Sequence, residues 1–136
     1  LNITNAYSAI NNNGKIQSPE IIEKIESFKK QPIWENKSIS KKILDLKINK
    51  KINKLLEKSV KEGTSKAASI KGKKIYGKTG TSDGNKDLWF IGSIDNLTTG
   101  IWIGYDDNKE SELSSGNAAY LWKKFISEIY KIPIKK

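Results

Sequence analysis

One run of six residues, GKTGTS at positions 77–82, combines an ammonium group, three hydroxyl groups and two glycines. Apolar stretches lie on both sides of it, so the run is expected to form part of a β-strand. Gly80 has no Cβ and lets a ligand backbone approach the strand closely. Because side chains alternate along a strand, Thr79 and Thr81 share one face. Their hydroxyls and the Lys78 ammonium predict a binding site for a carboxylate, since all three groups donate hydrogen bonds.

Two missing residue types limit the chemistry. The chain has neither His nor Cys, which excludes a Ser-His-Asp triad, a thiolate site and a disulfide. A Lys-assisted serine mechanism needs no His. The runs 27–30 and 38–41 fit the Ser-x-x-Lys pattern of such a nucleophile, but neither lies in an apolar helical stripe. The run 115–117 fits Ser-x-Asn, and we interpret it as the start of the last helix, with Ser or Asn as N-cap.

Composition predicts one domain with an exposed, basic surface. The 136 residues have 36% hydrophobic content, a mean hydropathy of −0.60 and a net charge of +10. No apolar run approaches the length of a membrane span. Every basic residue is Lys, spread along the chain, whereas nucleic-acid readers usually cluster basic residues and use Arg for base edges. A solvated Lys-rich surface is therefore preferred to a nucleic-acid binder. Neither a cofactor nor a metal site is expected.

Three strands and a helix are expected to position the GKTGTS run. Strands are predicted at 73–82, 87–95 and 99–105, and the turns Asp83-Gly84 and Asn96–Thr98 make them an antiparallel meander. A final helix from about 116 to 130 would pack its apolar face on this sheet. The fold class is therefore α+β. The expected apolar face consists of Ala118, Leu121, Trp122, Phe125, Ile126 and Ile129.

The N-terminal half is expected to contain two helices and a hairpin. A helix at 3–13 would end at Gly14, and short strands at 21–25 and 32–35 would flank a polar turn, with a helix over 20–30 as the alternative. The clearest helix is predicted at 48–62. Its expected core stripe is Ile48, Ile52, Leu55, Leu56 and Val60, and Asn49 and Asn53 lie off this stripe. The last residues, Pro133 to Lys136, are expected to form a frayed tail.

Several segments together resemble the C-terminal half of the transpeptidase domain of class A penicillin-binding proteins. After GKTGTS come Asp-x-Trp-Phe-x-Gly at 87–92, Trp-x-Gly-Tyr-Asp at 102–106 and Ala-x-x-x-Trp at 118–122. The run Ala6-Tyr7 with Asn13-Gly14 resembles the end of a family helix. Residues 63–68 resemble the family's Gly-Thr-Gly-x-Ala-Ala stretch, but Ser65 stands in place of the second Gly. Serine β-lactamases share the Lys-Thr-Gly strand but usually lack the two Trp-bearing strands.

The resemblance implies a peptidoglycan D,D-transpeptidase that cross-links stem peptides through a serine acyl-enzyme. The family's Ser-x-x-Lys and Ser-x-Asn motifs precede the Lys-Thr-Gly strand. Residues 1–136 are therefore expected to be the C-terminal portion of the domain, with the nucleophile outside the chain. By resemblance, Thr79 and Thr81 bind the terminal carboxylate, and the Thr81 N–H is one arm of an oxyanion hole. Lys78 assists proton transfer, and Gly80 and Ser82 complete the substrate-binding strand.

The resemblance also implies partners and a location. Stem peptides, β-lactams and the rest of the domain would be the partners, on the extracytoplasmic side of the membrane. Any membrane contact would come from an N-terminal anchor outside this chain. The strand at 99–105 would leave an open edge prone to self-association. The alternative is a non-catalytic, basic wall-binding or scaffold module on the same fold.

Two further sequence expectations concern the sheet. Trp89 and Trp102 are interpreted as core residues, because alternate apolar positions of a strand face the helices. Asp87 opens the second strand of the meander and is expected either to hydrogen-bond the turn after Ser82 or to be an exposed acid of that turn. Asp106 and Asp107 are interpreted as loop residues, since no EF-hand spacing surrounds them.

Overall fold

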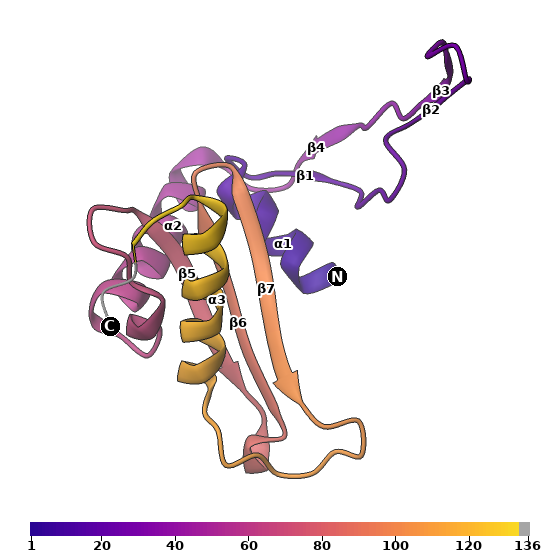
Figure 1. Cartoon of the computed structure of the whole chain (residues 1–136). Coiled ribbons are helices and arrows are strands. Elements are labelled where there is room, and N and C mark those ends of the chain that lie inside the picture. Colours follow the sequence, from indigo (N-terminus) through magenta and orange to yellow (C-terminus); the bar gives the residue numbers. More distant parts are fainter. Residues whose placement is uncertain (134–136) are drawn as a thin grey trace.

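The computed structural model describes residues 1–133 as an α+β fold (Figure 1). The expected tail beyond Pro133 lies outside the described residues. Two short 3₁₀ helices, at Lys66–Ala68 and Asp83–Asn85, join the main elements. These elements are α1 (Asn2–Asn11), β1 (Lys15–Gln17), β2 (Lys24–Glu26), β3 (Pro32–Glu35), β4 (Ser40–Lys42), α2 (Leu46–Glu62), β5 (Ile75–Thr81), β6 (Asp87–Ile94), β7 (Leu97–Gly104) and α3 (Ser115–Ile129).

The predicted antiparallel meander is confirmed, with strand order β5-β6-β7. Its second turn differs slightly from the prediction. Leu97 already pairs with Ile94, so only Asp95 and Asn96 form the turn. Asp95 has a φ of 50°, in the left-handed region that short hairpin turns need and that Asp tolerates.

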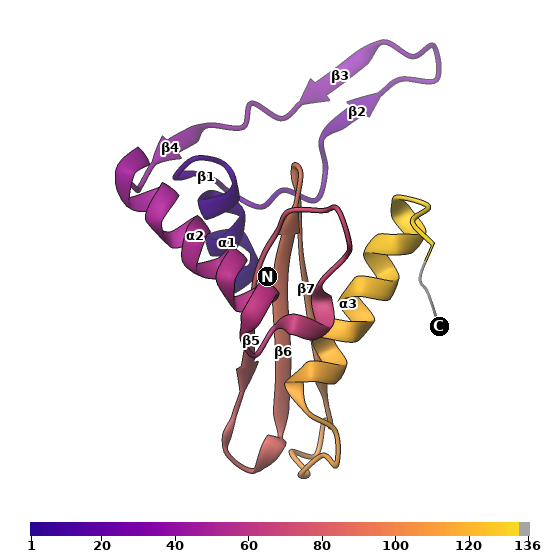
Figure 2. The same cartoon turned by 90° about the vertical axis from the view of Figure 1, so that its left-hand side faces the viewer.

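The main core lies between the sheet and α3, and α1 and α2 lie on the opposite side of the sheet (Figure 2). The rings of Phe90 and Trp122 meet edge to face, with centroids 5.3 Å apart. Both rings are fully buried. A Cβ on Gly92 would come within 2.6 Å of Phe90 and 2.8 Å of Trp122, so this glycine permits the close approach of α3 to the sheet.

The predicted apolar face of α3 is only partly correct. Ala118, Trp122 and Ile126 are buried as expected. The other three expected core residues are about half exposed: Leu121 (46%), Phe125 (45%) and Ile129 (50%). They form a neighbouring row at i, i+4 spacing, which turns away from the sheet. The 115–117 run starts the helix as predicted, but neither Ser115 nor Asn117 is the N-cap. The N-cap is Ser114, which forms a capping box with Asn117 at N3.

The expected core stripe of α2 is wrong in two respects. Ile48 and Leu55 are 52% and 69% exposed, whereas Asn49 is only 1% exposed. The Asn49 Nδ2 donates to the Ile10 carbonyl at 3.0 Å, and the Asn53 Nδ2 does so at 3.4 Å. These amides bind a carbonyl at the end of α1, which explains why the polar side of α2 faces the protein.

Residues 18–39 form an arm that projects from the body of the molecule (Figure 1). The predicted hairpin is confirmed as β2 paired with β3, although its first strand lies at 24–26 and not at 21–25, and the alternative helix over 20–30 is wrong. At the base of the arm, β1 pairs with β4, two strands that the sequence did not predict. Phe28, near the tip, is fully exposed. In the described part of the chain, no helix combines the length and apolarity needed to cross a bilayer.

Candidate active site

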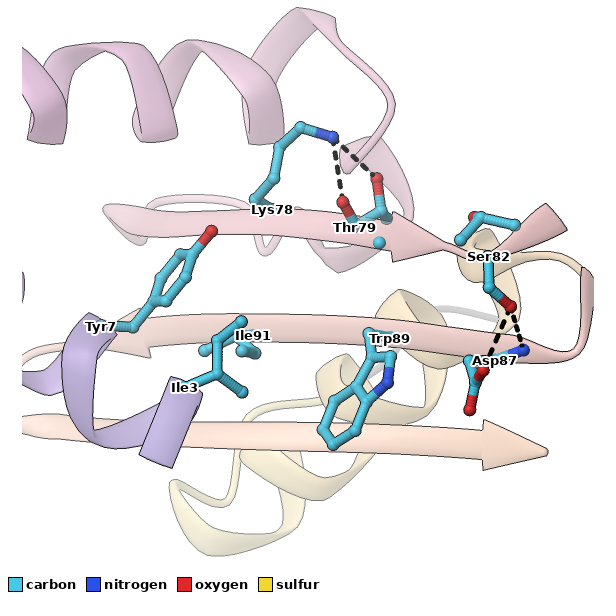
Figure 3. Close-up of a pocket in the computed structure, with 10 residues that line it drawn as sticks. Ile3, Tyr7, Lys78, Thr79, Ser82, Asp87, Trp89 and Ile91 are labelled. Atoms are coloured by element: carbon cyan, nitrogen blue, oxygen red, sulfur yellow. Dashed lines mark hydrogen bonds between the residues drawn. The ribbon is translucent and has the colours of Figure 1, made fainter. Parts of the chain in front are cut away.

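A groove of about 540 Å³ lies on the sheet face that carries α1, opposite α3 (Figure 3). All five residues predicted for the site line it, together with side chains from α1 and β6. The sequence missed the contribution of α1, because its apolar face was interpreted only as a helix surface. The lining consists of Ile3, Tyr7, Lys78, Thr79, Gly80, Thr81, Ser82, Asp87, Trp89 and Ile91.

The outer edge of β5 carries backbone groups that face away from β6. The Thr79 N–H donates to the Ser65 Oγ at 3.1 Å, outside the sheet. Since backbone N–H directions repeat every second residue in a strand, the Thr81 N–H points to the same outer side. Within residues 1–133, no strand pairs with this edge of the β5-β6-β7 sheet. The edge therefore presents a backbone donor beside the groove.

Lys78 and Thr79 form a polar cluster with Thr64, which follows α2. The Lys78 Nζ donates to the Thr79 carbonyl at 3.0 Å and lies 3.3 Å from each of the hydroxyls of Thr79 and Thr64. The Thr79 Oγ1 donates to the Thr64 Oγ1 at 3.0 Å. Among residues 1–133, no carboxylate lies within ion-pair distance of Lys78. The ammonium charge thus remains free to attract an anion into the groove.

Tyr7 and Ile3 form the wall of the groove on the α1 side (Figure 3). Burial raises the pKa of the Tyr7 phenol. The phenol therefore stays neutral at physiological pH, and its ring offers an apolar surface opposite the polar edge of β5. The groove combines an apolar wall with a positively charged rim, as expected for a peptide that ends in a carboxylate.

Ser65 has a structural role that the sequence analysis missed. It is fully buried, and its hydroxyl accepts hydrogen bonds from the Ser59 Oγ at 2.9 Å and from the Thr79 N–H. Ser65 thereby connects α2 to the middle of β5. The sequence indicated this role only by having Ser at a position where the family usually has Gly. Its partners Ser59 and Thr79 come together only in the folded chain.

Asp87 lies at the far end of the groove and bonds Ser82 itself, at the start of the turn that it was expected to bond. The Asp87 N–H donates to the Ser82 Oγ at 2.8 Å, and this hydroxyl lies 3.1 Å from the Asp87 carboxylate. The second carboxylate oxygen accepts the Trp102 Nε1–H at 2.9 Å. The prediction that Trp89 and Trp102 lie in the core is wrong. Their rings, 6.5 Å apart, cover the sheet face opposite α3, and Trp102 is 42% exposed.

The other serine patterns lie away from the groove. Ser27 and Ser38 are on the projecting arm, and Ser115 begins α3, so none of them lines the groove. Within residues 1–133, no cluster of three or more His, Cys, Asp or Glu side chains could hold a metal ion. In the loop after β7, Asp107 pairs with Lys109.

Comparison with known proteins identifies the family. The family model for the penicillin binding protein transpeptidase domain matches residues 1–125. Penicillin-binding protein 4 of Bacillus subtilis is 31% identical over 132 residues, which cover 96% of this chain and 21% of that protein. Penicillin-binding protein 1A of Aquifex aeolicus is 34% identical over 109 residues, or 80% and 15% of the two chains. The chain belongs to the penicillin-binding protein transpeptidase domain family, and it spans about a fifth or less of these relatives.

Solved structures show the same fold. The penicillin-binding protein PonA1 from Mycobacterium tuberculosis superposes with a TM-score of 0.82 at 18% identity, over 98% of this chain and 39% of that chain. The D,D-transpeptidase domain of a peptidoglycan glycosyltransferase from Eggerthella lenta gives a TM-score of 0.78 at 22% identity, over 96% and 32%. The α+β architecture is therefore the one found in transpeptidase domains.

Proposed function

We propose that the groove binds the carboxylate end of a peptidoglycan stem peptide, as part of a serine D,D-transpeptidase. In this proposal, residues 1–136 are the C-terminal portion of the domain. The rest of the domain supplies the nucleophilic serine and is the first partner of this chain. The observation that carries the proposal is the outer edge of β5. There the outward direction inferred for the Thr81 N–H, hydroxyl groups and the Lys78 ammonium, which has no carboxylate partner among residues 1–133, border one groove.

Each residue of the edge has a role in the proposed reaction. The hydroxyls of Thr79 and Thr81 bind the carboxylate of the donor peptide, and Ser82 borders the same subsite. The serine Oγ attacks the carbonyl carbon before the terminal residue, which leaves as a free amino acid. An amine of a second stem peptide then displaces the serine and takes over the acyl group.

Lys78 and Thr81 are the proposed catalytic residues. The Thr81 N–H stabilises the oxyanion that forms at the attacked carbonyl, a contribution of about 2.7–4 kcal/mol for one such donor. The Lys78 ammonium adds positive potential and assists the transfer of the serine proton to the leaving amine. Gly80 leaves room for the peptide backbone, because a Cβ there would point toward Trp89 at the groove.

The setting follows from the reaction. Stem peptides lie in the cell wall, so we propose an extracytoplasmic location for the parent protein, and β-lactams as inhibitors that acylate the same serine. One of the fold relatives, penicillin-binding protein A from M. tuberculosis, was solved as an imipenem acyl-enzyme complex. The alternative of a non-catalytic scaffold module is not favoured by the family match.

A fluorescent penicillin tests the proposal. The full-length product of the gene should become covalently labelled, and peptide mapping should place the adduct on a serine outside residues 1–136. The 136-residue chain alone should not be labelled. An adduct on Ser27, Ser38 or another serine of this chain would refute the proposed division of the domain. A full-length protein that stays unlabelled would favour the scaffold alternative.

A further inference from the structure

A second, strongly basic hollow lies between the base of the arm and α2. Lys15 and Lys42 from β1 and β4 line it, together with Lys50 of α2, and its volume is about 500 Å³. A smaller hollow of about 270 Å³ adjoins it, shares Asn13 and Lys50 with it, and adds Lys54 and Lys74. We call these two connected hollows the basic groove. It shares no lining residue with the candidate active-site groove.

The charges of the basic groove are poorly compensated. Within the described residues, Lys15, Lys50 and Lys54 have no carboxylate at ion-pair distance, and Lys42 reaches Asp45 only at 4.0 Å. The single lining carboxylate, Glu57, is already occupied. Its oxygens lie 2.8 Å from Lys61 and 3.9 Å from Lys74, and the hydrogen bond from Lys61 lowers the pKa of Glu57.

Strand pairing keeps two of these lysines together. Lys15 and Lys42 are direct cross-strand partners in the β1–β4 ladder. Like charges in directly opposite positions destabilise a sheet. Lys15 and Lys42 both line the hollow, and no acidic side chain lines it with them. This arrangement of charges suits the binding of an anion.

The backbone holds this arrangement in place. The Gly14 carbonyl accepts hydrogen bonds from the N–H groups of Ile43 at 2.8 Å and Leu44 at 3.2 Å. Gly14 has a φ of 80°, and a Cβ there would come within 2.6 Å of the Leu44 carbonyl oxygen. The turn before Lys15 is thus fixed against the start of α2. Leu46, the first residue of α2, also lines the hollow, and the helix is capped by Asp45, whose carboxylate accepts the Lys47 N–H at 2.8 Å.

From these observations we propose that the basic groove binds a phosphate-bearing anion. A phosphate group has several acceptor oxygens and can be met by several ammonium groups at once, and Lys is a common phosphate ligand. The phosphate could belong to a soluble oligophosphate or to the headgroup of an anionic lipid, and the two sources share this chemistry.

Inorganic triphosphate is the probe for the test. It is titrated into the ¹⁵N-labelled 136-residue chain at 0.15 M salt, and amide shifts are followed by NMR. The groove variant carries Lys15→Gln, Lys42→Gln and Lys50→Gln. The control variant carries Lys29→Gln, Lys30→Gln and Lys37→Gln on the arm, with the same loss of three charges.

The expected shifts centre on Gly14, Lys42 and Leu46. Losing three exposed ion pairs should weaken triphosphate binding by about tenfold in the groove variant, and by less than about twofold in the control. Equal weakening in both variants would show attraction to net charge alone and overturn the proposal. Absence of saturable shifts in the unmodified chain would also overturn it.

The melting temperature of the groove variant distinguishes an anion-binding role of these lysines from a structural role, because the two roles predict changes in opposite directions. Without ligand, the groove variant should melt at the same temperature as the unmodified chain or higher, because the repulsion between Lys15 and Lys42 is removed. A lower melting temperature would mean that these lysines serve the fold, which contradicts the proposal.

Vesicles separate the two sources of phosphate. Phosphatidylcholine vesicles with and without phosphatidylglycerol are sedimented with the unmodified chain and both variants. Binding to the anionic vesicles that is lost in the groove variant, and that triphosphate displaces, supports the site and identifies a lipid headgroup. Groove-dependent binding of triphosphate without binding to vesicles supports the site and identifies a soluble phosphate.

Discussion

Two glycines of β5, Gly77 and Gly80, differ in the space around them. A Cβ on Gly77 would lie 2.5 Å from the Phe90 ring, inside the core. A Cβ on Gly80 would meet only the Trp89 Cβ, at an ordinary 3.4 Å. The protein therefore has room for a side chain at position 80, and the absence of one is explained by the ligand that we propose for the groove.

Replacing each of these two glycines by alanine should separate folding from function. Gly80→Ala should change the free energy of unfolding by no more than about 0.5 kcal/mol, because its methyl group meets no obstacle. The same methyl group should slow acylation of the full-length protein by a fluorescent penicillin. Gly77→Ala should instead cost about 1–3 kcal/mol through overpacking. Urea unfolding and acylation rates measure both effects, and an unchanged acylation rate in Gly80→Ala would count against the groove as the substrate site.

Ser65 offers a second test at this scale. In Ser65→Ala the buried N–H of Thr79 loses its acceptor, which should lower the free energy of unfolding by about 1–3 kcal/mol. Ser38→Ala, on the exposed arm, is the matched control and should stay within about 0.5 kcal/mol. Urea unfolding of both variants gives the comparison. Equal stability of the two would show that the link between α2 and β5 contributes nothing.

At the scale of elements, the sequence predicted the strands and helices whose patterns reflect local geometry. The meander and α3 carry apolar residues at strand and helix spacing, so both were found. The β1–β4 ladder was not found, because its strands have three residues each and are largely polar. The inward side of α2 was misassigned because Asn49 is buried through a bond to α1, which spacing along one helix cannot reveal.

The same limit applies to the candidate site. Its strand was predicted from GKTGTS, since that information is local. The α1 wall and the link from Ser65 to Thr79 depend on long-range packing, so local sequence patterns could not predict them. The two Trp residues were misplaced because alternation along β6 and β7 shows that they share a face but not which face is covered by α3.

The arm should be dispensable for folding of the body. Gln17 and Ser40 are cross-strand partners at its base, so an Asn-Gly turn in place of residues 18–39 can close the β1–β4 hairpin. We expect the free energy of unfolding to change by no more than about 1 kcal/mol, the usual range for a surface change that leaves the core intact. Urea unfolding with near-ultraviolet circular dichroism measures this. Loss of the cooperative transition would show that the arm supports the body.

At the scale of the whole molecule, apolar side chains and strand edges are exposed. This agrees with a chain that covers only 15–21% of the length of the two relatives compared above. The outer edge of β7 is unpaired in the described sheet, and the row of Leu121, Phe125 and Ile129 on α3 is half exposed. Unpaired strand edges favour association between chains. In sedimentation experiments, the mass of the isolated chain should rise with its concentration. A monomer at all concentrations would contradict this prediction.

The most direct test of the account concerns the backbone N–H of Thr81. Thr81→Val removes the hydroxyl and keeps the N–H, whereas Thr81→Pro removes both, and an edge strand tolerates proline where the N–H faces outward. If this N–H stabilises the oxyanion, the full-length Thr81→Pro protein should be acylated by a fluorescent penicillin about 10²–10³ times more slowly than Thr81→Val. Equal acylation rates in the two folded variants would contradict the proposed active site.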